Sequence, residues 1–182
     1  MLVAFAYDEG VQEEKTIVAA ILNKSMLVTA HYKERSIEGV GQTYGPDSFT
    51  LDTAKYDLAH GVRAFGLRFS SFGPVANLAE SNNSDYLTLF MQKDKILNPV
   101  FSDFMEYQNA LIGVLGYPTG HEFIENGTKT ISISTSSTNG YADLIITETI
   151  KYDGDEEDRP PEINRANRTV KVIHKYDGNR YR

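Results

Sequence analysis

The sequence predicts a mainly β fold, an antiparallel β-sandwich of about eight to ten strands with one packed α-helix. One observation is an Asn-Gly pair, Asn139 and Gly140, which separates two alternating segments, Thr128–Thr138 and Tyr141–Tyr152. Such a pair favours the type I′ turn of a β-hairpin, because both residues tolerate positive φ. The other observation is that apolar residues alternate with polar ones in several further short segments, which is typical of strands with one buried face.

The hairpin also predicts a strand register. If Thr138 pairs with Tyr141, then Ile133 lies opposite Ile146, and the apolar side chains of both strands share one face. The opposite face is mostly Ser and Thr. The expected buried face consists of Ile131, Ile133, Leu144, Ile146 and Ile150.

The first part of the chain predicts an edge strand over Met1–Tyr7, followed by a hairpin. Lys15–Leu22 and Met26–Tyr32 are apolar runs separated by a short polar break, which suits two strands. A helix over Val11–Leu22 is the competing interpretation, because the segment has an acidic first turn and an Ala-Ala pair. The sequence leaves this choice open.

Three more strands and a helix are expected in the middle of the chain. Ser48–Thr53, Val62–Phe69 and Asp85–Gln92 read as strands, the last two with clear alternation. The segment Pro99–Leu115 reads as the packed helix, because it begins with proline, ends before a Gly-Tyr-Pro turn and has apolar residues at helical spacing. It should cover one end or edge of the sheet.

The last 30 residues predict a loop, a strand and a tail. Asp153–Asn167 is acidic and almost without apolar residues, so it reads as an exposed loop. Thr169–Tyr176 is expected to be a strand whose edge is unprotected. The basic tail Asn179–Arg182 is expected to fray.

Length and charge limit the classes of function. At 182 residues the chain predicts one domain, residues 1–182, and a formal charge of −7 argues against a surface that tracks nucleic-acid phosphates. The absence of cysteine excludes disulfides and thiol chemistry. The apolar start lacks a basic region, so we expect neither a signal peptide nor a transmembrane segment. Localisation stays open between the cytoplasm and release without a secretion signal.

Aromatic residues beside glycine and proline supply the candidate ligand-binding residues, Tyr44, Phe72 and Tyr117, each in a predicted loop. An exposed ring on a rigid loop can stack on a sugar face or enter a lipid interface, because it offers apolar area at low entropic cost. The alternative is that each ring packs on its neighbouring proline and fixes a turn.

Catalytic and metal-binding patterns do not stand out. The four histidines are scattered without HExxH spacing, and no GxSxG or phosphate-binding glycine loop occurs. The acidic run Asp153–Asp158 lacks the pattern of a calcium loop and favours a solvated charge cluster. We therefore expect a non-enzymatic protein with no cofactor and no metal, with a hydrolase whose site converges only in three dimensions as an alternative.

The order of elements resembles that of the actinoporin-like cytolysins and fungal fruit-body lectins. The best match is the closing strand, where Gly140, Ala142, Leu144 and Ile146 are similar to the small-Gly-x-Ala-x-Leu-x-Ile pattern of that group, with one residue of difference in spacing. The stretches that carry the resemblance are "KTIVAAILNKSMLV" (Lys15–Val28), "GVRAFGLRF" (Gly61–Phe69), "YLTLFMQ" (Tyr86–Gln92) and, with the closing strand, "STNGYADLIITETI" (Ser137–Ile150).

The resemblance implies a sandwich that recognises a lipid headgroup or a glycan. It supplies no site residue, because the region that corresponds to the phosphocholine pocket of the group reads "MQKDKILNPVF" (Met91–Phe101). The long amphipathic N-terminal segment of the cytolysins is not matched either, and whether the chain forms pores stays open. A self-assembling particle or coat subunit, a homo-oligomer formed through unprotected strand edges, is the alternative function.

Overall fold

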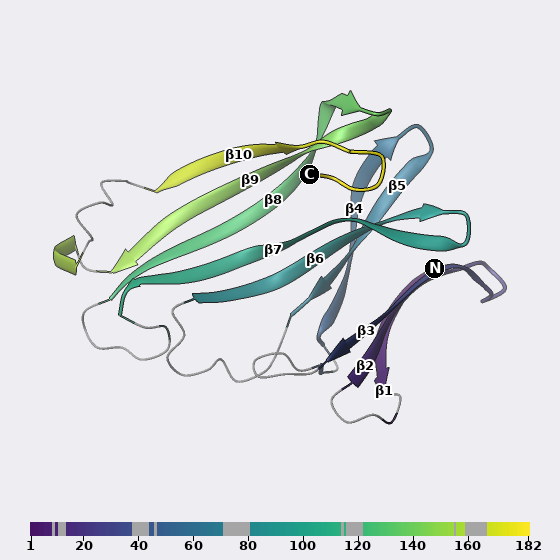
Figure 1. The fold of residues 1–182 in the computed structure, drawn as a ribbon, viewed down its shortest axis with the longest axis horizontal. Helices are drawn as coiled ribbons and strands as arrows, with labels where there is room; N and C mark the ends of the chain where they lie inside the picture. The colour runs from purple at the N-terminus through teal and green to yellow at the C-terminus, as the bar shows by residue number, and fades with distance from the viewer. Residues whose placement is uncertain are drawn as a thin grey trace.

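The computed structural model describes residues 1–8, 10, 14–37, 44–45, 47–70, 81–113, 115, 122–154, 156–158 and 167–182. Ten strands in these residues belong to one hydrogen-bonded sheet (Figure 1), so the fold is mainly β, as predicted. The strands are β1 (Leu2–Asp8), β2 (Glu14–Leu22), β3 (Val28–Ile37), β4 (Phe49–Ala59), β5 (Val62–Phe69), β6 (Ser81–Lys93), β7 (Ile96–Ile112), β8 (Phe123–Thr138), β9 (Tyr141–Gly154) and β10 (Arg168–His174), with a short 3-10 turn, η1 (Glu156–Asp158).

The long strand β7 joins the parts of the sheet. One edge of β7 pairs with β6, and the order then continues through β5 to β4. The other edge pairs with β8 from Glu106 onward, and β8 leads to β9 and β10. Near its start β7 also meets β3, in parallel, at the single pair His31 with Ile96. The sequence predicts a sandwich, which would have two separate sheets. These strands instead form one curled, mixed sheet.

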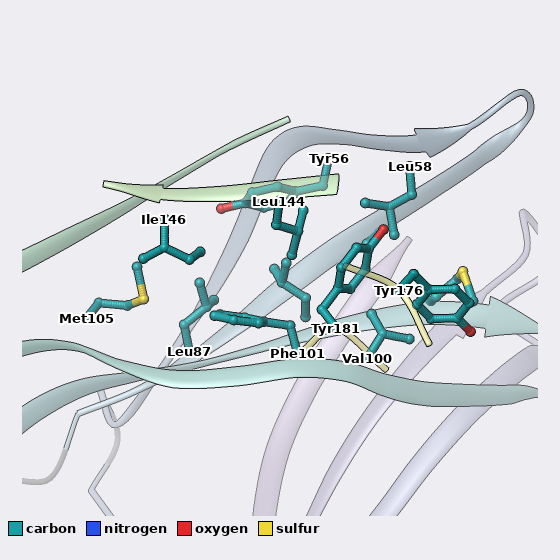
Figure 2. Close-up of a cluster of buried hydrophobic side chains, with 13 residues drawn as sticks. Tyr56, Leu58, Leu87, Val100, Phe101, Met105, Leu144, Ile146, Tyr176 and Tyr181 are labelled. Atoms are coloured by element: carbon teal, nitrogen blue, oxygen red, sulfur yellow. The ribbon is translucent and has the colours of Figure 1, made fainter. Parts of the chain in front are cut away.

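Two clusters of apolar side chains lie on opposite faces of the central strands β5 and β6. On one face, these strands and β7 pack against β4, β9 and the C-terminal residues (Figure 2). On the other face, β5, β6 and β7 pack against β1, β2 and β3. The first cluster is Tyr56, Leu58, Ala64, Leu87, Leu89, Met91, Val100, Phe101, Met105, Leu144, Ile146, Tyr176 and Tyr181; the second is Ala19, Ala30, Phe65, Leu67, Phe90 and Leu97.

The predicted helix over Pro99–Leu115 is wrong, because residues 96–112 form β7. A β-bulge explains the misleading pattern: Leu89 of β6 pairs with Phe101, but the next residue of β6 pairs with Pro99, so the register shifts between them. Val100 and Phe101 are both buried as a result. Together with Leu97 and Met105 they produce buried positions at spacings of three and four, which imitate a helix.

The Asn139-Gly140 hairpin is confirmed, but half of its register is wrong. Thr138 pairs with Tyr141 as predicted, and φ is 54° at Asn139 and 82° at Gly140. A register shift between Ile133 and Ser137 then places Ile133 opposite Leu144 rather than Ile146. The shift moves the pairing by two residues, so the predicted apolar face is kept.

The strands expected before residue 93 are confirmed, including the edge strand β1 and the hairpin of β2 and β3 that competed with a helix. The expected frayed tail is wrong. The chain after β10 turns back on itself, and Tyr176 pairs with Tyr181 in a short C-terminal hairpin, residues 175–182. Both rings are buried. Most of the predicted acidic loop, residues 153–167, lies outside the described residues.

Candidate functional site

Tyr44 is the one predicted ligand-binding residue that the structure describes; Phe72 and Tyr117 lie outside the described residues. The half-buried ring of Tyr44 stacks on Phe49 at 5.8 Å between centroids and lies 4.9 Å from the ring of Phe69. Its hydroxyl donates a hydrogen bond to Oγ of Ser36 at 2.5 Å. The loop that carries Tyr44 is therefore fastened to three strands, β3, β4 and β5.

These residues form one side of a cleft of about 320 Å³, which we call the aromatic cleft. The strands β2 to β7 all contribute to it, because the sheet curls so that β2 and β3 face the side of β5 and β6 that carries the second apolar cluster. Six of its thirteen lining residues are aromatic. The lining consists of Ile17, Tyr32, Glu34, Ser36, Tyr44, Phe49, Leu67, Phe69, Tyr86, Thr88, Phe90, Pro99 and Ser102.

Glu34 is the one carboxylate among the residues that line the aromatic cleft. It accepts a hydrogen bond from the hydroxyl of Tyr32, whose ring lies 4.9 Å from that of Phe90. Burial raises the pKa of Tyr32, and the hydrogen bond to Glu34 and the charge of Glu34 raise it further. The phenol therefore stays protonated and keeps donating, which orients the carboxylate at the exposed end of β3.

Hydroxyl groups provide the other polar contacts of the cleft. Oγ of Ser102 donates to Oγ1 of Thr88 at 3.1 Å, across the paired strands β6 and β7. Ser36 and the hydroxyl of Tyr44 form the second such pair. The cleft therefore combines flat apolar faces with neutral donors and acceptors and a single anion, a set that suits binding of a polyhydroxylated ligand.

An ion network on the opposite face of the sheet fixes the strands that carry the cleft. Arg68 lies between two cleft residues of β5 in the chain, and its guanidinium pairs with Asp52 of β4 at 3.0 Å and with Asp85 of β6. The hydroxyl of Tyr56 donates to the same Asp52 oxygen at 3.0 Å. Burial opposes the charge of Asp52, but hydrogen bonds from the Ala54 amide, Tyr56 and Arg68 outweigh it and hold the pKa of Asp52 below its ordinary value.

The sequence analysis missed most of the cleft. Phe69 and Phe90 are in predicted strands, and their alternation indicated burial rather than a site. Pairing β4 with β5 and β5 with β6 brings Phe49, Phe69 and Tyr86 into one row across the sheet. Such a row depends on strand order and register, so it has no local signature in the sequence.

The cleft lacks the paired carboxylates that glycoside hydrolysis requires, as far as its described lining shows. Among the described residues no group of three or more His, Asp or Glu side chains could hold a metal ion. No helix in the described part of the chain is long and apolar enough to cross a membrane.

Comparison with known proteins found no matching protein family, no matching curated protein and no matching solved structure.

Proposed function

We propose that this protein is a non-enzymatic recognition protein that binds a glycan in the aromatic cleft. The observation that carries the proposal is the set of rings, Tyr32, Tyr44, Phe49, Phe69 and Tyr86, that line one cleft together with hydroxyl groups and Glu34. A sugar has an apolar face of C–H groups that packs on a ring and an edge of hydroxyls that needs donors and acceptors. The volume, about 320 Å³, lies at the lower end of the range of small-molecule pockets.

Two expectations from the sequence support the same proposal. Tyr44 was predicted as a ligand-binding residue, together with the loop residues Phe72 and Tyr117. The resemblance to actinoporin-like cytolysins and fungal fruit-body lectins also implies recognition of a glycan or a lipid headgroup, although the sandwich that it implies is not the observed fold. Both stay predictions.

A glycan array, followed by calorimetry on the best ligand, tests the proposal. Tyr44→Ala should weaken binding about tenfold, equal to about 1.4 kcal/mol, because a stacking surface is lost. Tyr44→Phe keeps the ring and should lose much less. Tyr152→Ala is the matched control, because Tyr152 is stacked on Phe123 and does not line the cleft. Tyr152→Ala should bind like the wild type. If Tyr44→Ala does so too, the cleft is not the glycan site.

A lipid headgroup is the second candidate for the same cleft. A carboxylate beside several rings also suits a quaternary ammonium group, which is attracted to ring faces and to Glu34. Sedimentation with phosphatidylcholine vesicles distinguishes the two. Binding to these vesicles that is lost in Glu34→Gln favours the headgroup, whereas binding to oligosaccharides but not to vesicles favours the glycan.

The edge strand β10 favours the alternative of a self-assembling subunit. Among the described strands it pairs only with β9, and Val172 and Ile173 are exposed on it. An unpaired apolar edge can pair with the same strand of a second copy. In sedimentation, the wild type should then form an oligomer and Ile173→Lys should be a monomer. A wild type that stays monomeric at high concentration would contradict assembly through β10.

A further inference from the structure

A second groove lies beside the aromatic cleft, where one edge of β7 has no partner among the strands of the described residues. β7 pairs with β3 at Ile96 and with β8 from Glu106 onward, and between these points the C-terminal hairpin approaches it. The amide of Tyr181 donates to the carbonyl of Val100 at 2.7 Å. The groove has a volume of about 630 Å³ and is lined by Tyr86, Pro99, Val100, Phe101, Ser102, Asp103, His174, Arg180, Tyr181 and Arg182. We call it the hairpin groove.

The charges of the hairpin groove are mostly positive, although the whole chain carries −7. Asp103 is the carboxylate of its lining, and Nζ of Lys129 neutralises it at 2.7 Å. Arg182 pairs with Asp177 through Nε at 2.6 Å. In the part of the chain that the structure describes, the guanidinium of Arg180 forms no salt bridge, although its charge helps to lower the pKa of Asp177. A free guanidinium offers five N–H donors in a planar fork that matches a carboxylate or a sulfate.

The C-terminal hairpin holds the backbone of Arg180 in place. Oδ1 of Asp177 accepts hydrogen bonds from the amides of Asn179 and Arg180, each at 2.9 Å. Tyr176 and Tyr181 are buried in the first apolar cluster (Figure 2). Because the backbone of the hairpin is anchored on both sides of Arg180, less order has to be gained when a ligand binds than on a free tail.

The two grooves share a wall. Tyr86, Pro99 and Ser102 line both the aromatic cleft and the hairpin groove. A ligand that stacks on rings in the cleft can therefore extend past Ser102 toward Arg180. This adjacency connects a stacking surface with an anion-binding one.

We propose that the hairpin groove binds the anionic group of the ligand whose sugar ring occupies the aromatic cleft, so that the ligand is an acidic oligosaccharide, carrying carboxylates or sulfates. This inference rests on the proposed glycan function. Arg180 is the residue that binds the anionic group, with Arg182 beside it. The aromatic cleft alone selects for a sugar, and the hairpin groove selects among sugars by charge.

The test uses pairs of probes that differ only in charge. Tetragalacturonate is compared with its methyl ester, and a sulfated heparin tetrasaccharide with its desulfated form, by calorimetry at 50 and 300 mM salt. In the better pair the acidic member should bind the wild type at least tenfold more tightly, and the difference should shrink at high salt because the ions screen the contact. In Arg180→Ala the difference should disappear while binding of the uncharged member stays the same, and Arg180→Lys should restore part of it.

Each outcome separates this inference from the proposed function. If the two members of both pairs bind equally well, or if Arg180→Ala keeps the difference, the hairpin groove does not bind the anion; loss of both members in Tyr44→Ala would then still support the glycan function. If the acidic member depends on Arg180 but not on Tyr44, the anion site is supported and the aromatic cleft is not. If no member of either pair binds, the acidic-oligosaccharide proposal is overturned. Thermal unfolding verifies that Arg180→Ala folds, which is expected because its side chain is exposed and makes no ion pair.

Discussion

The hydroxyl of Tyr56 links the ionisation of one residue to the stability of the chain. The residue is 6% exposed and its hydroxyl donates to Asp52. Burial first, and then the hydrogen bond to Asp52 and its charge, raise the pKa of Tyr56 from 10.0 to about 12. A pKa that is higher in the folded state means that the folded state holds the proton more tightly. This contribution to stability is complete below pH 10 and is lost as the pH rises towards 12.

Tyr56→Phe should lower the free energy of unfolding at pH 7 by about 1.5–3 kcal/mol, because a hydrogen bond to a charged group is lost while the ring is kept. The stability of the variant should also fall less steeply between pH 10 and 12. Urea unfolding at a series of pH values measures both effects. Part of the alkaline loss should remain, since burial also raises the pKa of Tyr176 and Tyr181. Equal slopes for the two proteins would contradict the link.

Asp143 is a buried carboxylate that the fold does not fully satisfy. It is 3% exposed, and among the described residues its Oδ1 atom has no hydrogen-bond partner. Asp143→Asn removes the charge and keeps the shape, so it should increase the free energy of unfolding by about 1 kcal/mol or more. The same substitution at exposed Asp153 is the control for the change in net charge and should have an effect within about 0.5 kcal/mol. Destabilisation by Asp143→Asn alone would show that the charge has a partner in solution.

At the scale of strands, β-bulges explain two predictions from the sequence that are wrong. The predicted helix at Pro99–Leu115 and the predicted pairing of Ile133 with Ile146 both assume an unbroken period, and both fail at a register shift. A bulge depends on the partner strand, so one strand read alone does not reveal it. The Asn139-Gly140 turn was predictable because its conformation is decided by two adjacent residues.

Close packing of β4, β5 and β6 depends on Gly66. A Cβ atom at this position would lie 2.7 Å from Cδ1 of Leu87 and 2.9 Å from Cβ of Asp52. Gly66→Ala should therefore cost about 1–3 kcal/mol of stability through overpacking. A double-mutant cycle with Leu87→Ala checks the cause: in the Gly66→Ala background the loss of the leucine should cost less than in the wild type, because its space is already crowded. Additive effects would assign the cost to the backbone instead.

The Asn139-Gly140 turn also holds the C-terminal hairpin. Nδ2 of Asn139 donates to the carbonyl of Tyr176 at 2.7 Å. Asn139→Asp keeps a residue that tolerates positive φ but replaces the donor with a carboxylate, so it should lower stability by about 1 kcal/mol and speed proteolysis after residue 174. Asn83→Asp, at an exposed site of β6, is the control. Unchanged proteolysis in Asn139→Asp would show that the tyrosines alone hold the hairpin.

For the whole molecule, the fold class and most strands could be predicted from the sequence, whereas the sheet order and the site could not. The alternation in Val62–Phe69 indicates a strand, but not that β7 connects β6, β8 and β3. Of the aromatic cleft, only Tyr44 was predicted, because it lies in a loop. Its partners Phe49 and Phe69 come from paired strands, and the contact exists only once those strands are in register.

The single pair of His31 with Ile96 has a thermal consequence. In the described part of the chain, β1, β2 and β3 are joined to the rest of the sheet by little backbone hydrogen bonding, so the side chains of the second apolar cluster supply most of the attachment. Attraction between apolar groups weakens on cooling, whereas the hydrogen bonds inside each part of the sheet do not rely on it. Cooling should therefore loosen the contact between β1–β3 and the rest of the sheet before it disturbs the strands on either side. The aromatic cleft lies between β2 and β3 on one side and the rest of the sheet on the other. Its two sides should therefore separate on cooling while both parts of the sheet stay folded.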